Sequence, residues 1–196
     1  MNALILIDIQ NDFLPGGSLE VPKGDEIIDN INSIMDNYSM VVATKDWHPK
    51  NHISFASNHN NKKAGQIITI NNLDQILWPD HCIKDSKGSE FSEKLDSHKI
   101  HKIFYKGVDS NIDSYSGFYD NGKIRSTGLS NFLKKNNINQ VDIVGLATDY
   151  CVKYSSIDAY NEGFKTNVLR FCVRGISVET TETVFKEMKD IGISII

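Results

Sequence analysis

The sequence predicts a three-layer α/β fold, with an open, mostly parallel sheet of about six strands and helices on both faces. Short β-branched, apolar runs alternate along the chain with amphipathic stretches, which is the pattern of parallel strands joined by helices. Each strand candidate is apolar along nearly its whole length, as expected of a strand that is covered on both faces.

The predicted strands, in chain order, are residues 3–8, 40–44, 101–105, 141–145, 165–169 and 193–195. The predicted helices are residues 25–36, 126–136, 149–162 and 179–190. In the first of these helices, Ile27, Ile31 and Ile34 recur at helical spacing and form one apolar face that is directed to the core.

The stretch 45–99 has only weak signals of regular structure, and it contains both tryptophans. It is long for a connection inside a compact domain, and such loops are usually functional. At about 150 residues per domain, a chain of 196 residues corresponds to one domain. We therefore interpret residues 1–196 as a single domain, in which 45–99 is a loop excursion from the end of the second strand.

Composition and charge exclude several classes of protein. A chain with 40% hydrophobic and 23% charged residues is typical of globular proteins, and its net charge of −4 gives no electrostatic reason to bind nucleic acid. The apolar run at residues 3–7 is far shorter than the roughly 20 residues that span a bilayer, and it lacks the flanks of a signal peptide. The three widely spaced cysteines do not resemble a disulfide framework. The sequence predicts a cytoplasmic protein with a free thiol and no membrane partner.

Residues that could take part in catalysis or metal binding follow the predicted strands. In open parallel sheets, ligands bind beyond the carboxyl ends of the strands. Asp8 ends the first strand, Asp46 and His48 follow the second, Lys106 follows the third, and Cys151 comes shortly after the fourth. We expect these residues to surround one crevice.

Cys151 is a candidate nucleophile. It follows Thr148 and Asp149, two good N-cap residues, so it is predicted to lie in the first turn of a helix. The free N–H groups and the helix dipole there lower a cysteine pKa and can bind an oxyanion. A small buried apolar residue is the alternative, which we also adopt for Cys82 and Cys172.

Asp8 and Lys106 could activate this thiol. A carboxylate within reach of the thiol could take its proton, and a lysine beside the carboxylate favours the charged form of both groups. Solvated or capping roles for the two residues remain the alternative.

Asp46, His48 and His81 form a candidate metal site. Asp46 and His48 occupy alternate positions of an extended segment and so point to the same side, while Pro79 stiffens the approach to His81. Carboxylate and imidazole together suit zinc, iron or manganese better than calcium or magnesium. The alternative is a histidine-bearing surface loop without metal, since the spacing matches no zinc-finger or zincin pattern.

Aromatic residues gather in the irregular segments after these positions, where they could hold a flat aromatic substrate or pack the base of the loops. They are Phe13, Trp47, Trp78, Tyr115, Phe118 and Tyr119.

Several short segments together resemble a known family. They are LIDIQNDF at 6–13, PGGSL at 15–19, TKDWHP at 44–49, WPDHC at 78–82, KG at 106–107, YSGF at 115–118 and GLATDYCV at 145–152. In these segments the chain resembles the nicotinamidases, including pyrazinamidase-like proteins, of the isochorismatase-like cysteine hydrolase superfamily. The match runs in the family's order from residue 3 to about residue 175. The opening motif is shared across the superfamily, whereas TKDWHP at 44–49 and WPDHC at 78–82 together are typical of its metal-bearing nicotinamidases.

The resemblance implies roles for individual residues. It implies a catalytic triad of Asp8, Lys106 and Cys151, and an oxyanion hole formed by the backbone N–H groups of Ala147 and Cys151 beside a cis peptide bond after Leu146. It implies Asp46, His48 and His81 as ligands of one divalent transition metal, zinc ahead of iron or manganese, with His52 as an outer ligand only; the substrate would contact Phe13, Trp78 and Tyr115.

The implied activity is hydrolysis of nicotinamide to nicotinate and ammonia through a thioester on Cys151, as a step of NAD salvage, with pyrazinamide as a further substrate. The metal would hold the pyridine nitrogen and orient the ring. A small molecule is therefore the expected partner. Oligomers are frequent among similar proteins, so a homo-oligomer stays open, although the sequence shows no interface signature.

Four alternatives were weighed. The chain could be another small-amide hydrolase of the superfamily, an isochorismatase, a non-catalytic binding module or a redox sensor. Isochorismatases generally lack the nucleophilic cysteine and the metal triad, and a silent module should have lost Asp8, Lys106 or Cys151. A redox sensor would need a resolving cysteine at a suggestive spacing.

Overall fold

The computed structural model describes residues 1–70 and 72–196, and strand β1 (Asn2–Ile7) lies inside its main sheet. β1 pairs in parallel with β2 (Val41–Asp46) on one side and with β6 (Gln140–Leu146) on the other. All residues of β1 after Asn2 are buried, which explains why this strand is apolar throughout.

The main sheet has six strands in the order β5-β2-β1-β6-β7-β8, and each pair is parallel. Its other strands are β5 (Lys102–Lys106), β7 (Lys165–Arg174) and β8 (Ser194–Ile195). The chain builds outward from β1 to β5 and then returns to add β6 on the other side of β1. The strand order therefore reverses between β1 and β6, and at such a point the loops beyond the carboxyl ends separate and leave room for a ligand.

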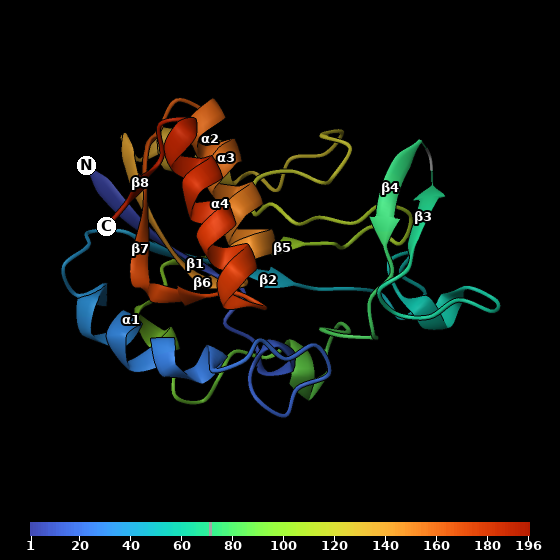
Figure 1. Cartoon of the computed structure of the whole chain (residues 1–196). Coiled ribbons are helices and arrows are strands. Elements are labelled where there is room, and N and C mark those ends of the chain that lie inside the picture. The colour runs from blue at the N-terminus through green and yellow to red at the C-terminus, as the bar shows by residue number, and fades with distance from the viewer. Residues whose placement is uncertain (71) are drawn as a thin grey trace.

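Helices cover both faces of the sheet, which confirms the predicted three-layer arrangement (Figure 1). They are α1 (Ile28–Met35) on one face and α2 (Leu129–Lys135), α3 (Lys153–Asn161) and α4 (Val178–Asp190) on the other. Among the described residues, no helix has the length and the apolar character that crossing a bilayer requires.

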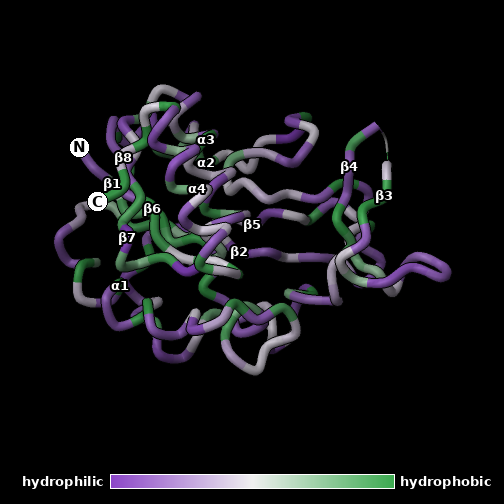
Figure 2. The backbone as a smooth tube through the Cα atoms, in the orientation of Figure 1, coloured by the Kyte–Doolittle hydropathy of each residue, from purple (hydrophilic) through white to green (hydrophobic). Residues whose placement is uncertain are grey.

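The two faces of β1 contribute to two separate cores. Ala3, Ile5 and Ile7 point to the side covered by α2, α3 and α4, whereas Leu4 and Leu6 point to the side covered by α1. This division follows from the two-residue period of a strand. The hydrophobic colour of the backbone is concentrated in the central strands of the sheet (Figure 2).

The segment 45–99 contains one element that the sequence did not predict, an antiparallel pair of short strands, β3 (Ile67–Ile70) and β4 (Leu73–Ile76). This pair stands apart from the main sheet (Figure 1). β3 does contain a β-branched run, but this run is only four residues long and none of it is buried, while β4 mixes apolar and polar residues and buries only Gln75.

The predicted strands and helices are present, but some of their ends differ. β7 continues five residues past its predicted end at residue 169, where its register with β6 shifts between Ile143 and Gly145. The predicted helix 25–36 begins as a 3-10 turn, Gly24–Ile27, and the predicted helix 149–162 begins as a turn of π-helix, Thr148–Val152.

Candidate active site and metal centre

Lys106, the last residue of β5, is the centre of a buried polar group. Its ammonium lies 2.9 Å from a carboxylate oxygen of Asp8 and 2.6 Å from one of Asp46. It also donates to the carbonyl of Ser114 at 3.0 Å and lies 3.4 Å from the sulfur of Cys151. Burial lowers the pKa of Lys106, but the charges of Asp46 and Asp8 outweigh burial and raise it well above its usual value. Lys106 therefore stays charged and joins the two carboxylates to the thiol.

Asp8 is held where β1 ends. It adopts a left-handed backbone conformation, with φ of 49°, which turns the chain away from the sheet. Its carboxylate accepts the hydroxyl of Thr44 at 2.6 Å, and a carboxylate oxygen lies within 4.8 Å of the sulfur of Cys151. Burial raises the pKa of Asp8 more than the charge of Lys106 lowers it. A carboxylate with a raised pKa is suited to accept and return a proton near neutral pH.

Cys151 lies in the π-helical turn that precedes α3. The peptide bond between Leu146 and Ala147 is cis, as expected, and Ala147 is the residue that begins this turn. The predicted capping by Thr148 and Asp149 is wrong, since no side chain caps the turn. The carboxylate of Asp149 instead accepts the backbone N–H of Ile176 at 3.1 Å.

The expected lowering of the Cys151 pKa is also wrong. Burial raises the pKa of Cys151 well above its ordinary value, and the charge of Lys106 offsets only part of that effect. The nearby negative charge of Asp8 raises the pKa further. The thiol is therefore protonated at neutral pH, so that its reactivity depends on a base that lies close to it.

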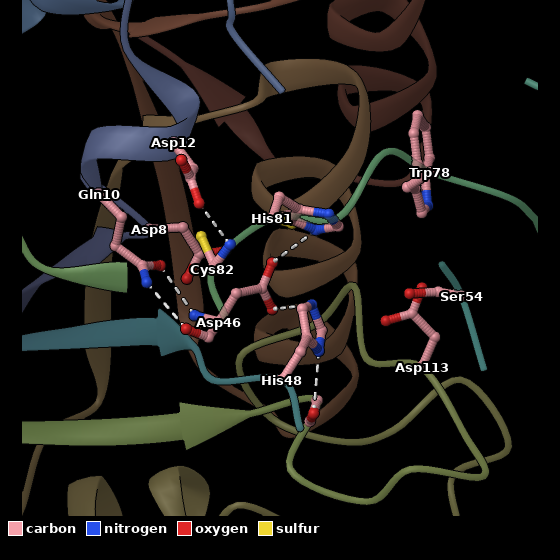
Figure 3. A network of polar contacts seen from close by, with 12 residues as sticks. Asp8, Gln10, Asp12, Asp46, His48, Ser54, Trp78, His81, Cys82 and Asp113 are labelled. Carbon is pink, nitrogen blue, oxygen red and sulfur yellow. Dashed lines mark hydrogen bonds and ion pairs between the residues drawn. The ribbon is translucent and has the colours of Figure 1, made fainter. Parts of the chain in front are cut away.

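The side chains of the three candidate metal ligands, Asp46, His48 and His81, point toward one another, as Figure 3 shows. The Nε2 atoms of His48 and His81 lie 3.6 and 3.9 Å from the two carboxylate oxygens of Asp46. One ligand atom from each of the three residues lies within 4.8 Å of the others, and all three side chains are buried. Asp46 and His48 do face the same side, as their alternate positions predicted.

The contacts of Nδ1 in His48 and His81 show which ring nitrogen could bind a metal. The Nδ1 atoms of His48 and His81 lie 2.9 and 2.7 Å from the carbonyl oxygens of Gly107 and Pro79. A carbonyl only accepts, so each Nδ1 carries a proton, and in a neutral ring the Nε2 then presents a lone pair to Asp46. Burial lowers the pKa of His48, but the charge of Asp46 and the other acceptors around His48 outweigh burial and raise that pKa, so a positive charge is favoured between these side chains. This donor set therefore fits a divalent metal ion.

Gly107 is needed for this contact. It has a φ of +62°, and a Cβ atom placed on it would lie 2.2 Å from the ring of His48. Any larger residue would push the histidine out of position.

His52 lies next to His48 but outside the set of three candidate ligands. Its ring centroid is 4.1 Å from that of His48, and its Nδ1 accepts the backbone N–H of Ser54 at 3.4 Å. The hydroxyl of Ser54 also lies 2.7 Å from this Nδ1. Burial, together with the charge of His48, lowers the pKa of His52 to about 4.

A cavity of about 210 Å³ opens onto the thiol. All three aromatic residues that the sequence singled out for the substrate line it, namely Phe13, Trp78 and Tyr115. Ala147 and Cys151 line the same cavity, as do the metal-site residues Asp46 and His81. The structure thus brings together the candidate residues from five separate segments. All three cysteines are free, and only Cys151 reaches this cavity.

Sequence reasoning missed several lining residues, among them Asp113, Tyr150 and Ile176. Ile176 follows β7. Because ligands bind beyond the carboxyl ends of parallel strands, the end of this strand also indicates residues near the site. Tyr150 is next to Cys151 and packs edge-on against Trp78, with ring centroids 5.0 Å apart. Asp113 lies in a loop, and no sequence pattern indicates that it lines the cavity.

The isochorismatase domain family matches residues 2–196 of the chain. The chain belongs to this family. Among the relatives of this isochorismatase-family chain, the nicotinamidase of Escherichia coli K12 is 40% identical over 198 residues, which cover 97% of this chain and 92% of the relative.

Two solved structures extend this comparison. The nicotinamidase/pyrazinamidase of Acinetobacter baumanii superimposes with a TM-score of 0.96 at 40% identity, covering 100% of this isochorismatase-family chain and 95% of the other. The pyrazinamidase of Pyrococcus horikoshii, solved in complex with zinc, superimposes with a TM-score of 0.82 at 36% identity and covers 100% and 98% of the two chains.

Proposed function

We propose that this chain is a nicotinamidase, which hydrolyses nicotinamide to nicotinate and ammonia as a step of NAD salvage and also accepts pyrazinamide. The observation that carries the proposal is the position of Lys106, whose ammonium contacts Asp8 and also Asp46 and Cys151, two residues that line one cavity. Nicotinamidases among its relatives support the choice of substrate.

In the first half of the reaction, Asp8 takes the proton of Cys151 as the sulfur attacks the amide carbon. Lys106 stabilises the thiolate as it forms, because its ammonium already lies 3.4 Å from the sulfur. The backbone N–H groups of Ala147 and Cys151 would bind the oxyanion, an interaction whose loss typically costs about 10²–10³ in rate. Asp8 then gives its proton to the amide nitrogen, which leaves as ammonia, and a thioester remains on Cys151.

In the second half, water attacks the thioester. Asp8 takes a proton from this water, the hydroxyl adds to the thioester carbon, and the sulfur of Cys151 leaves as a thiolate. The proton on Asp8 returns to the sulfur, so both residues regain their starting forms, and the nicotinic acid that is released gives up its proton to water and becomes nicotinate.

The cavity supports a small flat substrate. Its volume of about 210 Å³ is below the roughly 300–1,000 Å³ of pockets that bind drug-sized ligands. Phe13, Trp78 and Tyr115 offer aromatic surfaces to a pyridine or pyrazine ring.

Asp46, His48 and His81 would hold the metal, and we propose zinc. Two imidazoles and one carboxylate are a common ligand set for catalytic zinc, and the zinc complex of the Pyrococcus horikoshii pyrazinamidase supports the choice. When bound, the metal supplies a Lewis acid that can anchor the ring nitrogen of the substrate and orient the amide toward Cys151.

The test measures ammonia release from nicotinamide by the zinc-loaded protein and by two cysteine variants. Cys151→Ala should abolish turnover, whereas Cys172→Ala, which also removes a buried sulfur but lies outside the cavity, should retain it. Mass spectrometry of the acid-quenched wild type should show an acyl adduct on the peptide that contains Cys151.

Three results would overturn parts of the proposal. Ammonia release by Cys151→Ala would rule out the thioester. Turnover of benzamide as fast as nicotinamide would rule out a role for the ring nitrogen, and turnover of another small amide alone would move the substrate assignment within the superfamily.

A further inference from the structure

Strand pairing between β1 and β2 stops before it reaches the candidate metal site. The last paired residues are Leu6 and Ala43. After Ile7 the chain turns away at Asp8, which has a left-handed φ. Asp46, the last residue of β2, therefore has no β1 residue beside it, although it pairs with β5 on its other side.

The side chain of Gln10 takes the place of the missing strand. Its Nε2 donates to the backbone carbonyl of Asp46 at 2.8 Å, and its Oε1 accepts the backbone N–H of Asp46 at 2.8 Å. Figure 3 shows this pair of hydrogen bonds. The primary amide thus satisfies both backbone groups of a residue that lies 36 positions away.

Gln10 is itself immobilised. It is fully buried, and its second amide hydrogen donates to the carbonyl of Ser89 at 2.9 Å. Both hydrogens and the oxygen of the amide are therefore in use, which leaves the side chain a single orientation. The amide of Gln10 on one side and strand β5 on the other side thus hold the backbone of Asp46 in place.

The carboxylate of Asp46 needs this support because it serves two sets of partners. One oxygen lies 2.6 Å from the ammonium of Lys106 and 3.6 Å from His48, and the other faces His81. A small rotation of the Asp46 backbone would weaken contacts on both sides. We infer that Gln10 is a positioning residue, which orients Asp46 toward the metal and Lys106 at the same time.

The same short segment supports the opposite side of the metal site. Asp12 accepts the backbone N–H of Cys82 at 2.7 Å, and Cys82, with φ of 45°, directly follows the candidate ligand His81. Gln10 and Asp12 thus support two of the three candidate ligands through their backbones. This inference rests on the metal site of the proposed function but not on the identity of the substrate.

The test compares zinc affinity in the wild type, Gln10→Met and Asn11→Ser. Methionine keeps the volume of glutamine and removes its donors and acceptor. Asn11→Ser is the matched control, because Asn11 also donates an amide hydrogen to a backbone carbonyl nearby, that of Lys87, but does not contact Asp46. The zinc dissociation constant is measured by competition with a chromophoric chelator, alongside the melting temperature.

We expect Gln10→Met to weaken zinc binding by about 10–100-fold, the usual effect of losing an outer-shell partner, and Asn11→Ser to leave it unchanged. Excess zinc should restore part of the activity that Gln10→Met loses, which loss of folding would not allow. Gln10→Asn, which keeps the amide but shortens it by one methylene, provides a second variant if methionine prevents folding.

Folded Gln10→Met or Gln10→Asn protein with wild-type zinc affinity would overturn the inference. So would an equal loss in Asn11→Ser, or a wild type that binds no zinc. A wild type that binds zinc but does not hydrolyse nicotinamide would instead overturn the proposed function, and the zinc affinities would still test Gln10.

Discussion

Lys106 and Asp46 form a buried ion pair in which the ammonium lies 2.6 Å from the carboxylate, and this pair connects the thiol to the candidate metal centre. Burial raises the pKa of Asp46, but Lys106, His48 and His81 together outweigh burial and lower that pKa below its ordinary value. The two residues are Cα partners at the ends of β2 and β5, so the register of the sheet determines their contact.

Lys106→Met should abolish ammonia release and destabilise the protein by about 3–5 kcal/mol, because it leaves buried carboxylates without their partner. Since domains are typically stable by about 5–15 kcal/mol, we expect the variant to remain folded. Urea unfolding measures the change. Lys123→Met is the control, since Lys123 pairs with Asp158 while 60% exposed and should contribute no more than about 1 kcal/mol. Equal effects of the two substitutions would contradict the special role of Lys106.

Removal of the metal should abolish activity, and added zinc should restore it. Dialysis against a chelator followed by elemental analysis tests this directly. His81→Ala should lose the metal because it removes one of three ligand atoms that lie within 4.8 Å of one another. His98→Ala removes an exposed histidine and should keep the wild-type metal content. Retention of the metal by His81→Ala would disprove this ligand set.

Trp78→Leu should raise KM for nicotinamide by about 3–10-fold with little change in kcat, because an aromatic contact contributes about 0.5–1.5 kcal/mol. The indole N–H donates to the hydroxyl of Tyr115 at 3.3 Å, so the two rings form one wall of the cavity. Trp47 packs against Tyr105, with ring centroids 5.1 Å apart, and Trp47→Leu serves as the control. Steady-state kinetics would refute the assignment if both substitutions raised KM equally.

Glu162 should make stability depend on acid pH. Hydrogen bonds from Lys134, Ser130 and Tyr119 lower the pKa of Glu162 from 4.5 to about 2. As the pH falls, the unfolded chain takes up this proton before the folded protein does. The contribution of Glu162 is therefore fully present above about pH 4.5 and is lost as the pH falls toward about 2.

Chemical denaturation between pH 6 and pH 2 tests this prediction for Glu162→Gln, and the pH values are chosen to bracket roughly the range in which carboxylates titrate. The variant should lose less stability on acidification than the wild type. The exposed residue Glu179 of α4 provides the control substitution Glu179→Gln, which should follow the wild-type curve. A wild-type slope in Glu162→Gln would show that these hydrogen bonds do not favour the ionised carboxylate.

The strands and helices of the main sheet could be predicted from the sequence because burial on both faces leaves a clear apolar pattern. β1, for example, is buried from Ala3 to Ile7 and was predicted to within one residue at each end. Strands β3 and β4 were missed because the β-branched run of β3 is only four residues long and β4 mixes apolar and polar residues. The π-helical start of the turn at Cys151 was also missed, since Thr148 and Asp149 have the residue types of N-caps but neither caps the turn, and Asp149 bonds to Ile176 instead.

The candidate site was predictable where a residue type and a strand end coincided, as for Asp8, Asp46 and Lys106. Their positions relative to one another depend on the strand order, which the sequence pattern alone does not reveal. The role of Gln10 was missed because a side chain that bonds to the backbone of a distant strand leaves no periodicity in the sequence. The raised pKa of Cys151 was missed because it results from the depth of the cavity.

The short contacts among Asp8, Lys106 and Cys151 have a consequence for the energy of the reaction. When a proton passes from the sulfur to the carboxylate, a negative charge moves from one atom to a close neighbour, and the sum of charges around Lys106 stays the same. No counterion has to enter this interior of low polarity, and none has to leave it. We therefore expect the barrier for this proton transfer not to depend on the salt concentration of the surrounding solution.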